Sequence, residues 1–145
     1  MATQVPQHFY GSEQQWLATL NVGGTDYGTF DKFAGGDVSA PVNKHRPGGM
    51  GPEITYLSLP VYSDVTLTKV YETQRDHARI AALHAAVGNQ LATVTLQPLD
   101  DTGAAWGTAR TYSGRIVAVK DGGTDSTSNA ARMFEVDIAV ENVSN

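Results

Sequence analysis

The stretch DKFAGGDVSAPVNKHRPGGMGPEITYLSLP, residues 31–60, has the length of a connection but carries many apolar side chains. Its glycines permit backbone angles that other residues avoid, and its prolines exclude a helix interior or a central strand. The apolar residues, too many for a solvated spacer, are Phe33, Val38, Val42, Met50, Ile54, Tyr56 and Leu57. Compact domains rarely hold about 20 structureless residues without a function. We therefore expect a long loop that projects from a scaffold and buries apolar surface against another subunit.

The overall composition is that of one globular domain with a lightly charged surface. The chain has 145 residues, 41% of them hydrophobic, which is enough for one domain with a real core. Charged residues make up 17%, against a usual share of about 25%. The 15 glycines favour a turn-rich β fold. We expect residues 1–12 to form a flexible N-terminal arm and residues 13–145 a single domain.

Charge and cysteine content argue against several classes of protein. The net charge is −5 and no basic patch is present, which disfavours nucleic-acid binding through phosphates. The absence of cysteine excludes disulfides, thiol chemistry and cysteine-bound zinc. The first 12 residues lack the features of a signal peptide, and no apolar run approaches the length of a membrane span. We expect a protein that is made and used in soluble form, without membrane insertion.

Apolar and polar residues alternate in several stretches, as they do in half-buried strands. These stretches are 14–22, 27–33, 63–72, 91–99 and 131–143. Residues 104–119 add one long bent strand or two short ones, hinged near Gly114. The pattern predicts a mainly β fold, a β-sandwich or barrel of about six or seven strands with one flanking α-helix.

One helix is predicted over residues 74–87. Thr73 and Asp76 resemble a capping box at its start, and Gly88 is suited to end it. Ile80, Leu83 and Val87 would form one apolar stripe. At about 14 residues, or ~21 Å, such a helix fits across a sheet.

The histidines and paired aspartates do not make a convincing chemical site. His77 and His84 are seven positions apart on the predicted helix, about 10.5 Å along its axis, and cannot share a metal ion. Asp100-Asp101 lies in a turn, where carboxylates usually cap the backbone and are solvated. The Gly48-Gly49-Met50-Gly51 run does not join a strand to a helix. We expect no enzyme activity, no metal site and no cofactor.

Two polar features keep an alternative open. The loop 121–129 is rich in oxygen-bearing side chains, although it lacks the ligand order of an EF-hand. A β-sandwich binding or adhesin module could use this loop for a carbohydrate or a cation. Glu135, Asp137 and Glu141 share the polar face of the last strand. That face is either solvated or an acidic lining past which a polyanion would slide, because like charges repel.

The order of several motifs resembles the major tail tube proteins of long-tailed bacteriophages. The motifs are GTFDKFAGGD at 28–37, RPGGM at 46–50, the strand 65–71 followed by the helix 74–87, and YSGRIV at 112–117 before a loop and an apolar last strand. Together they cover nearly the whole chain beyond the first 12 residues. Type VI secretion and contractile-tail tube subunits are similar in fold.

The resemblance implies a structural virion protein that forms hexameric rings, stacked into a tube that conducts DNA through its lumen without specific binding. It implies tape-measure, tail-terminator and distal-tail proteins as further partners, and a location in the virion tail after synthesis in the host cytoplasm. The long loop would reach a neighbouring ring. Its candidate contact residues are Phe33, Val38, Arg46, Met50, Ile54 and Tyr56, and the candidate acidic residues facing the lumen are Glu135 and Asp137.

Overall fold

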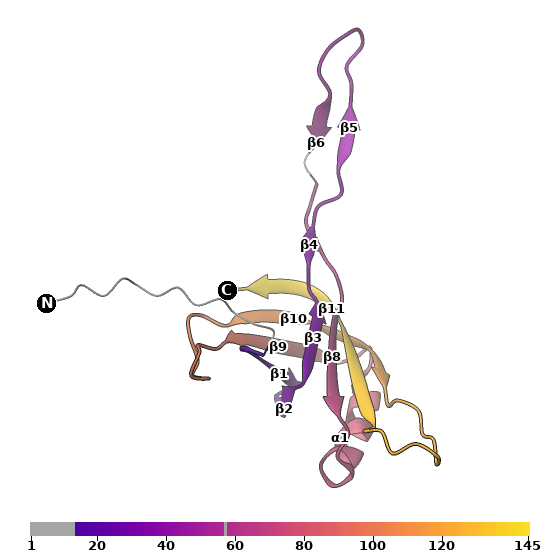
Figure 1. Ribbon diagram of the computed structural model, residues 1–145. Coiled ribbons are helices and arrows are strands. Elements are labelled where there is room, and N and C mark those ends of the chain that lie inside the picture. The colour runs from indigo at the N-terminus through magenta and orange to yellow at the C-terminus, as the bar shows by residue number, and fades with distance from the viewer. Residues whose placement is uncertain (1–13, 57) are drawn as a thin grey trace, which may run out of the picture.

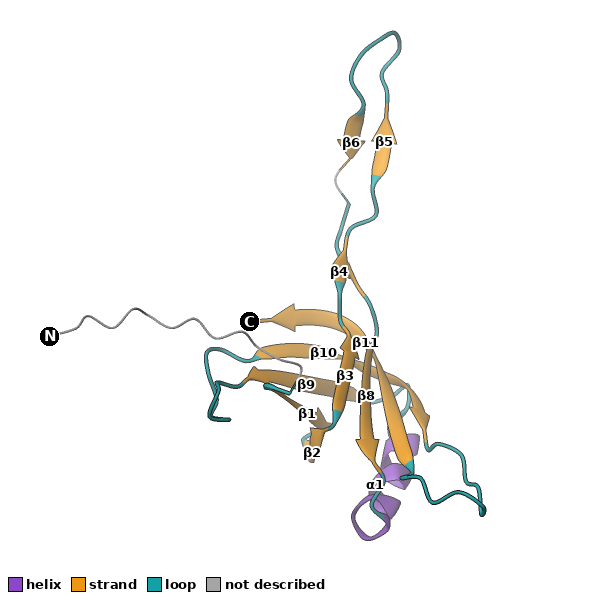
Figure 2. Cartoon of the chain, viewed as in Figure 1, coloured by secondary structure: helices purple, strands orange, loops and turns teal. Residues whose placement is uncertain are grey.

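The computed structural model describes residues 14–56 and 58–145, so the predicted N-terminal arm, residues 1–12, lies outside the described residues. One 7-stranded antiparallel sheet dominates the fold (Figures 1 and 2). Its order is β2 (Thr25–Phe30), β1 (Trp16–Val22), β9 (Leu91–Pro98), β10 (Arg110–Lys120), β11 (Met133–Ser144), β8 (Val65–Val70) and β3 (Lys32–Gly35). The remaining elements are β4 (Val38–Ser39), β5 (Asn43–His45), β6 (Ile54–Tyr56), β7 (Val61–Tyr62) and α1 (Thr73–Ala86).

The two outermost strands of the sheet, β2 and β3, are consecutive in the chain and are separated only by Asp31. The Asp31 amide donates to the Thr68 carbonyl at 2.9 Å, and the Asp31 carboxylate accepts from the Val70 amide at 2.9 Å. One bent segment therefore pairs with β1 before the bend and with β8 after it. This bend closes the sheet into a barrel, which confirms the predicted mainly β fold with one helix.

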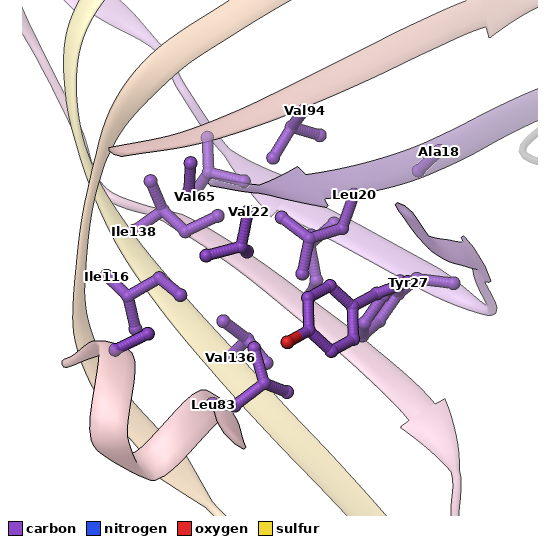
Figure 3. Close-up of a cluster of buried hydrophobic side chains, with 14 of the residues drawn as sticks. Ala18, Leu20, Val22, Tyr27, Val65, Leu83, Val94, Ile116, Val136 and Ile138 are labelled. Atoms are coloured by element: carbon purple, nitrogen blue, oxygen red, sulfur yellow. The ribbon is translucent and has the colours of Figure 1, made fainter. Parts of the chain in front are cut away.

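Strand alternation fills the barrel with apolar side chains. Leu20, Leu67, Ile116 and Ile138 have 0% exposure. Figure 3 shows Leu83 of α1 entering the same cluster beside Val136 and Ile116, so the helix covers the barrel on this side. The alternation predicted for residues 63–72, 91–99 and 131–143 is confirmed on strands β8, β9 and β11, whose buried apolar residues are Val65, Leu67, Ala92, Val94, Phe134, Val136 and Ile138.

The helix begins and ends close to the predicted residues, but the predicted cap was wrong. Its N-cap is Glu72, which makes no side-chain capping bond. Instead, the buried Asp76 carboxylate accepts the Glu72 amide at 2.9 Å and the Arg75 guanidinium at 2.7 and 2.8 Å. Burial raises the pKa of Asp76, but the hydrogen bonds from Arg75 and Glu72 outweigh burial and hold that pKa below its ordinary value. The carboxylate is thus kept charged while it fastens the first turn to the chain before it.

The segment predicted as one or two strands over 104–119 contains one strand that starts only at Arg110. Residues 104–109 form part of the connection from β9. The ladder between β10 and β11 shifts register between Ser113 and Gly114, at the predicted hinge. A Cβ atom at position 114 would lie 1.9 Å from the Ala139 carbonyl oxygen, so only glycine fits this close approach of two strands.

Candidate subunit contact surfaces

The stretch predicted as a long loop, residues 31–60, begins with β3 in the barrel and continues from residue 38 as a β-hairpin that stands away from the barrel (Figure 1). Asp37 and Ser63 form its base: the Asp37 amide donates to the Ser63 hydroxyl and the Ser63 amide to the Asp37 carbonyl, both at 2.9 Å. Beyond this base, β4 pairs with β7 and β5 pairs with β6. We call residues 38–62 the arm. Short ladders interrupted by glycine and proline make it extended, although its sequence lacks strand periodicity.

The base of the arm has a fixed geometry. Gly35 and Gly36 have φ angles of 91° and 75°, which L side chains rarely adopt. A Cβ atom at Gly35 would lie 1.9 Å from the Asp64 carbonyl oxygen, and one at Gly36 would lie 2.7 Å from the Tyr112 ring. The chain therefore turns out of the barrel at two positions where only glycine fits.

The arm is long relative to the body that carries it. About 12 residues separate its base from its tip, and extended chain spans at most ~3.3–3.6 Å per residue, so the arm can reach ~40 Å. A chain of this length has a compact radius of gyration of only ~15 Å. A two-stranded hairpin is marginally stable alone in water. Both facts make the arm a candidate surface for contact with another molecule.

Most of the predicted contact residues lie on this arm and are exposed. Val38, Met50, Ile54 and Tyr56 expose 62%, 103%, 46% and 51% of their surface, and Arg46 near the tip is also exposed. Further exposed apolar side chains on the arm are Val42, Leu59 and Val61. Single exposed apolar residues are ordinary, but so many on one projecting segment make it a candidate interaction surface.

Phe33 differs from the other predicted contact residues because it belongs to the barrel. It lies on β3, is partly buried against the core, and its ring centroid is 5.3 Å from that of Tyr112. A charged residue at position 33 would therefore damage the barrel as well as any contact. This position cannot test the arm separately from the fold.

The paired part of the arm has two chemically different faces. His45 lies opposite Ile54 and Asn43 opposite Tyr56, and these four residues share one face because strand side chains alternate. Lys44 and its partner Thr55 point to the other face. One face is thus aromatic and aliphatic, and the other carries the positive charge.

Cations from a neighbouring strand partly neutralise the predicted acidic face. Lys120 lies 3.8 Å from Glu135 and 3.6 Å from Asp137, and Asp137 also accepts a hydrogen bond from the Thr66 hydroxyl at 2.9 Å. Arg115 similarly lies 3.8 Å from Glu141. Sequence reasoning missed these partners because they come from β10 and β8, and only the register of the sheet brings them to this face.

The outer face of the sheet next to these charges is uncharged and rich in hydroxyl groups. Cross-strand pairs place Thr19 beside Thr95 and Thr95 beside Thr111, while Thr93 lies beside Ser113 in the next row. The polar positions were visible in the sequence as alternation, but their alignment into rows depends on the ladder. The face offers hydrogen-bonding groups that carry no charge.

Besides the outer edges of β2 and β3, the end of β11 is open on one side within the described residues. Strand β8 pairs with β11 only from Met133 to Ile138, whereas β10 pairs with β11 as far as Ser144. Residues 139–144 therefore present backbone groups on one side that no strand in 14–56 or 58–145 takes up. Such an edge is a template for pairing with another chain.

The acidic turns cap the backbone. The Asp100 carboxylate accepts from the Thr102 hydroxyl at 2.7 Å and from the Thr102 and Ala104 amides, and these hydrogen bonds lower its pKa. Asp125, in the loop 121–129, accepts from the Thr127 amide and hydroxyl, which lower its pKa in the same way. Their oxygens are used inside the turns, which offers no support for a cation or glycan site there.

The two helix histidines make separate contacts. His77 Nδ1 lies 3.4 Å from the Tyr71 hydroxyl, and His84 Nε2 lies 2.9 Å from the Asp121 carboxylate. Across residues 14–56 and 58–145, no three His, Asp or Glu side chains are grouped so that they could hold a metal ion. Nor does this part of the chain contain a helix long and apolar enough to cross a membrane.

Comparison by sequence found no matching family model and no matching curated protein. Comparison by structure found solved chains with the same fold. One comes from the sheath–tube complex of the extracellular contractile injection system PVC in its extended state. Its TM-score is 0.71 at 17% identity, and the match covers 93% of this chain and 90% of that chain. Another comes from the cap that terminates the tube of the anti-feeding prophage. Its TM-score is 0.70 at 12% identity, and the match covers 98% of this chain and 94% of that chain.

A third, from the six-fold symmetrised baseplate of the anti-feeding prophage, has a TM-score of 0.69, 15% identity, and 99% of this chain and 96% of that chain covered. At these identities the likeness establishes the fold and not the activity. The chain has a tail-tube-like fold that is similar to chains in contractile injection systems.

Proposed function

We propose that this protein is a non-enzymatic tube subunit of a phage tail or a related contractile injection system, and that copies of it assemble into stacked rings. The observation that carries this proposal is the ~40 Å arm, which presents a series of exposed apolar side chains from a closed and well-packed barrel. A tube needs such an element, because each ring must hold the next. The similar chains in a sheath–tube complex and a tube cap support the same reading and favour the contractile kind.

Two different surfaces would make the two kinds of contact. Within a ring, the open edge at residues 139–144 would pair with a strand of the next subunit, which removes an edge that is hazardous in a monomer. Between rings, the arm would lie on a subunit of the neighbouring ring. Six subunits per ring is our proposal, supported by the six-fold symmetry of the baseplate that contains one similar chain.

The outer face of the sheet is our candidate for the lumen wall. It combines the hydroxyl rows at Thr93 and Thr95 with Glu135 and Asp137, which share Lys120. A wall whose carboxylates are partly neutralised repels a polyanion only weakly, so DNA or another cargo could pass without binding. Tail-terminator, tape-measure and distal-tail proteins would be the remaining partners in the tail, with synthesis in the host cytoplasm.

Negative-stain electron microscopy of the purified protein across a concentration series tests the proposal. Rings or hollow tubes whose pore admits duplex DNA are the expected result. Monomers at every concentration up to the millimolar range would contradict it. Size-exclusion chromatography on the same samples separates ring formation from stacking, since the two contacts involve different surfaces.

A further inference from the structure

A second exposed aromatic surface lies at the end of the barrel where β1 begins and β9 ends. Trp16 pairs with Pro98 across the ladder, and the Trp106 amide donates to the Pro98 carbonyl at 3.0 Å, which brings both tryptophans to the same strand end. Trp16 and Trp106 expose 45% and 56% of their surface. We call Trp16, Trp106 and Asp101 the end platform.

Backbone and side-chain bonds hold the end platform in place. The Leu99 amide donates to the Gln15 carbonyl at 2.7 Å, and the Gln15 side chain donates to the Asp101 carboxylate at 2.9 Å. Leu99 and Ala105 form an isolated bridge across the connection that carries Trp106. The platform is therefore a fixed surface with two aromatic rings and a carboxylate.

The arm has complementary chemistry. The charged residues of the arm are Lys44, Arg46 and Glu53. The arm therefore has a net positive charge, in a chain whose net charge is −5. Arginine and lysine bind favourably over tryptophan faces and beside carboxylates, and methionine packs well against aromatic rings. Met50 at the arm tip is fully exposed.

We propose that the basic tip of the arm, Lys44 to Met50, docks on the end platform of a neighbouring copy of this chain. This inference rests on the proposed tube function and names the surface that receives the arm. Within one chain the arm stands away from the connection that carries Trp106 (Figure 1), so the arm does not occupy its own platform, and the occupant that follows from stacked copies is a second copy. Tryptophan and arginine are the residues that most often dominate such contacts.

Cysteine pairs provide a direct test because the chain contains no cysteine of its own. Arg46→Cys protein and Asp101→Cys protein are mixed in equal amounts, allowed to assemble, and oxidised. A mixed disulfide between positions 46 and 101, detected by mass spectrometry of the peptides, is expected because a disulfide requires Cα atoms within about 7 Å. The matched control replaces Asp101→Cys with Asp125→Cys, another exposed acidic position in a turn, and should crosslink at least about tenfold less.

Charge reversal gives a second measurement. Asp101→Arg should raise the concentration needed for assembly about tenfold, and combining it with Arg46→Asp should restore most of the loss, as expected for a pair of charges at an interface. Thermal unfolding of each variant shows whether the barrel is intact. Loss without restoration in the double variant would overturn the pairing.

The remaining outcomes are distinguishable. Assembly without a 46–101 crosslink, or with a stronger 46–125 crosslink, overturns the platform assignment and leaves the tube function standing. In a separate Phe9→Cys, Trp106→Cys variant, an intramolecular disulfide, together with no 46–101 crosslink in the mixed pair, would overturn the platform assignment by showing that the N-terminal residues occupy the platform. Failure to assemble at all overturns the tube function, and with it this inference.

Discussion

In the barrel, Leu67 and Ile138 are 0% exposed and every strand is held on at least one side by a neighbour in the same chain. On the arm, Leu59 and Met50 are 86% and 103% exposed, and only short ladders connect the two halves. The barrel thus buries its apolar side chains within the same chain, whereas the arm leaves its apolar side chains exposed. Under the proposed function, stability depends on the barrel residues and assembly on the arm residues, so a substitution should affect one property without the other.

The largest effect on stability is expected from Leu67→Ala in the barrel. Removing a fully buried leucine side chain leaves a cavity, and the free energy of unfolding should fall by about 2–5 kcal/mol. Chemical denaturation followed by circular dichroism measures it. A loss below about 1 kcal/mol would mean that the barrel can collapse around the gap, and that the contrast with the arm is weaker than we infer.

Asp76→Ala should have the next largest effect. It leaves the Glu72 amide and the Arg75 guanidinium without their carboxylate at the start of α1. Because Arg75 is partly exposed, we expect a loss of about 1–3 kcal/mol in the free energy of unfolding, below that of a fully buried pair. Asp76→Asn keeps the shape and an acceptor oxygen, and should lose less.

The same carboxylate predicts a dependence on pH. The pKa of Asp76 is lower in the folded barrel than in the unfolded chain, so its stabilisation is complete above the unfolded value of about 3.9. As pH falls below this value and through the folded pKa, the stabilisation is lost. Denaturation midpoints measured from pH 6 to pH 2 should fall less steeply in Asp76→Asn. Equal slopes in both proteins would show that Asp76 does not contribute.

Lys69→Met should change stability little, or raise it by up to about 1 kcal/mol. Burial lowers the pKa of Lys69, which means that its charge is held at a cost inside the barrel. Its amine is 3.4 Å from the Tyr27 carbonyl and 5.3 Å from the Phe30 ring centroid. A clear loss of stability in thermal melts would show that these contacts outweigh the cost of burying the charge.

The smallest effect on stability should come from the arm itself. Met50→Asp, or deletion of residues 44–52, should leave the free energy of unfolding within about 0.5 kcal/mol, because Met50 contacts nothing that holds the barrel. Both changes should nevertheless block tube formation in electron micrographs. Val117→Asp, an exposed residue on the barrel, is the matched control. Tubes of normal length from the arm variants would refute the separation of roles.

The sequence predicted those parts of the fold that depend on local pattern. The period-2 alternation of Phe134, Val136 and Ile138 predicted an inward face, and the composition of residues 31–60 predicted a projecting element. Contacts between distant segments left no local signal. The closure at Asp31 requires both β1 and β8, and the pairing of Lys120 with Glu135 requires the register of β10 on β11. Phe33 was misplaced for the same reason, since its partner Tyr112 lies far along the chain.

The closing bend at Asp31 also has a mechanical consequence. The arm leaves the barrel from β3 and returns into β8, and these two strands are hydrogen-bonded to each other. A pull on the arm therefore draws both strands in the same direction and does not peel them apart. The load passes to the ladder between β8 and β11, where the six residue pairs from Met133 to Ile138 are strained together in shear. A tube linked by such arms would resist stretching along its length with the full strength of each barrel wall.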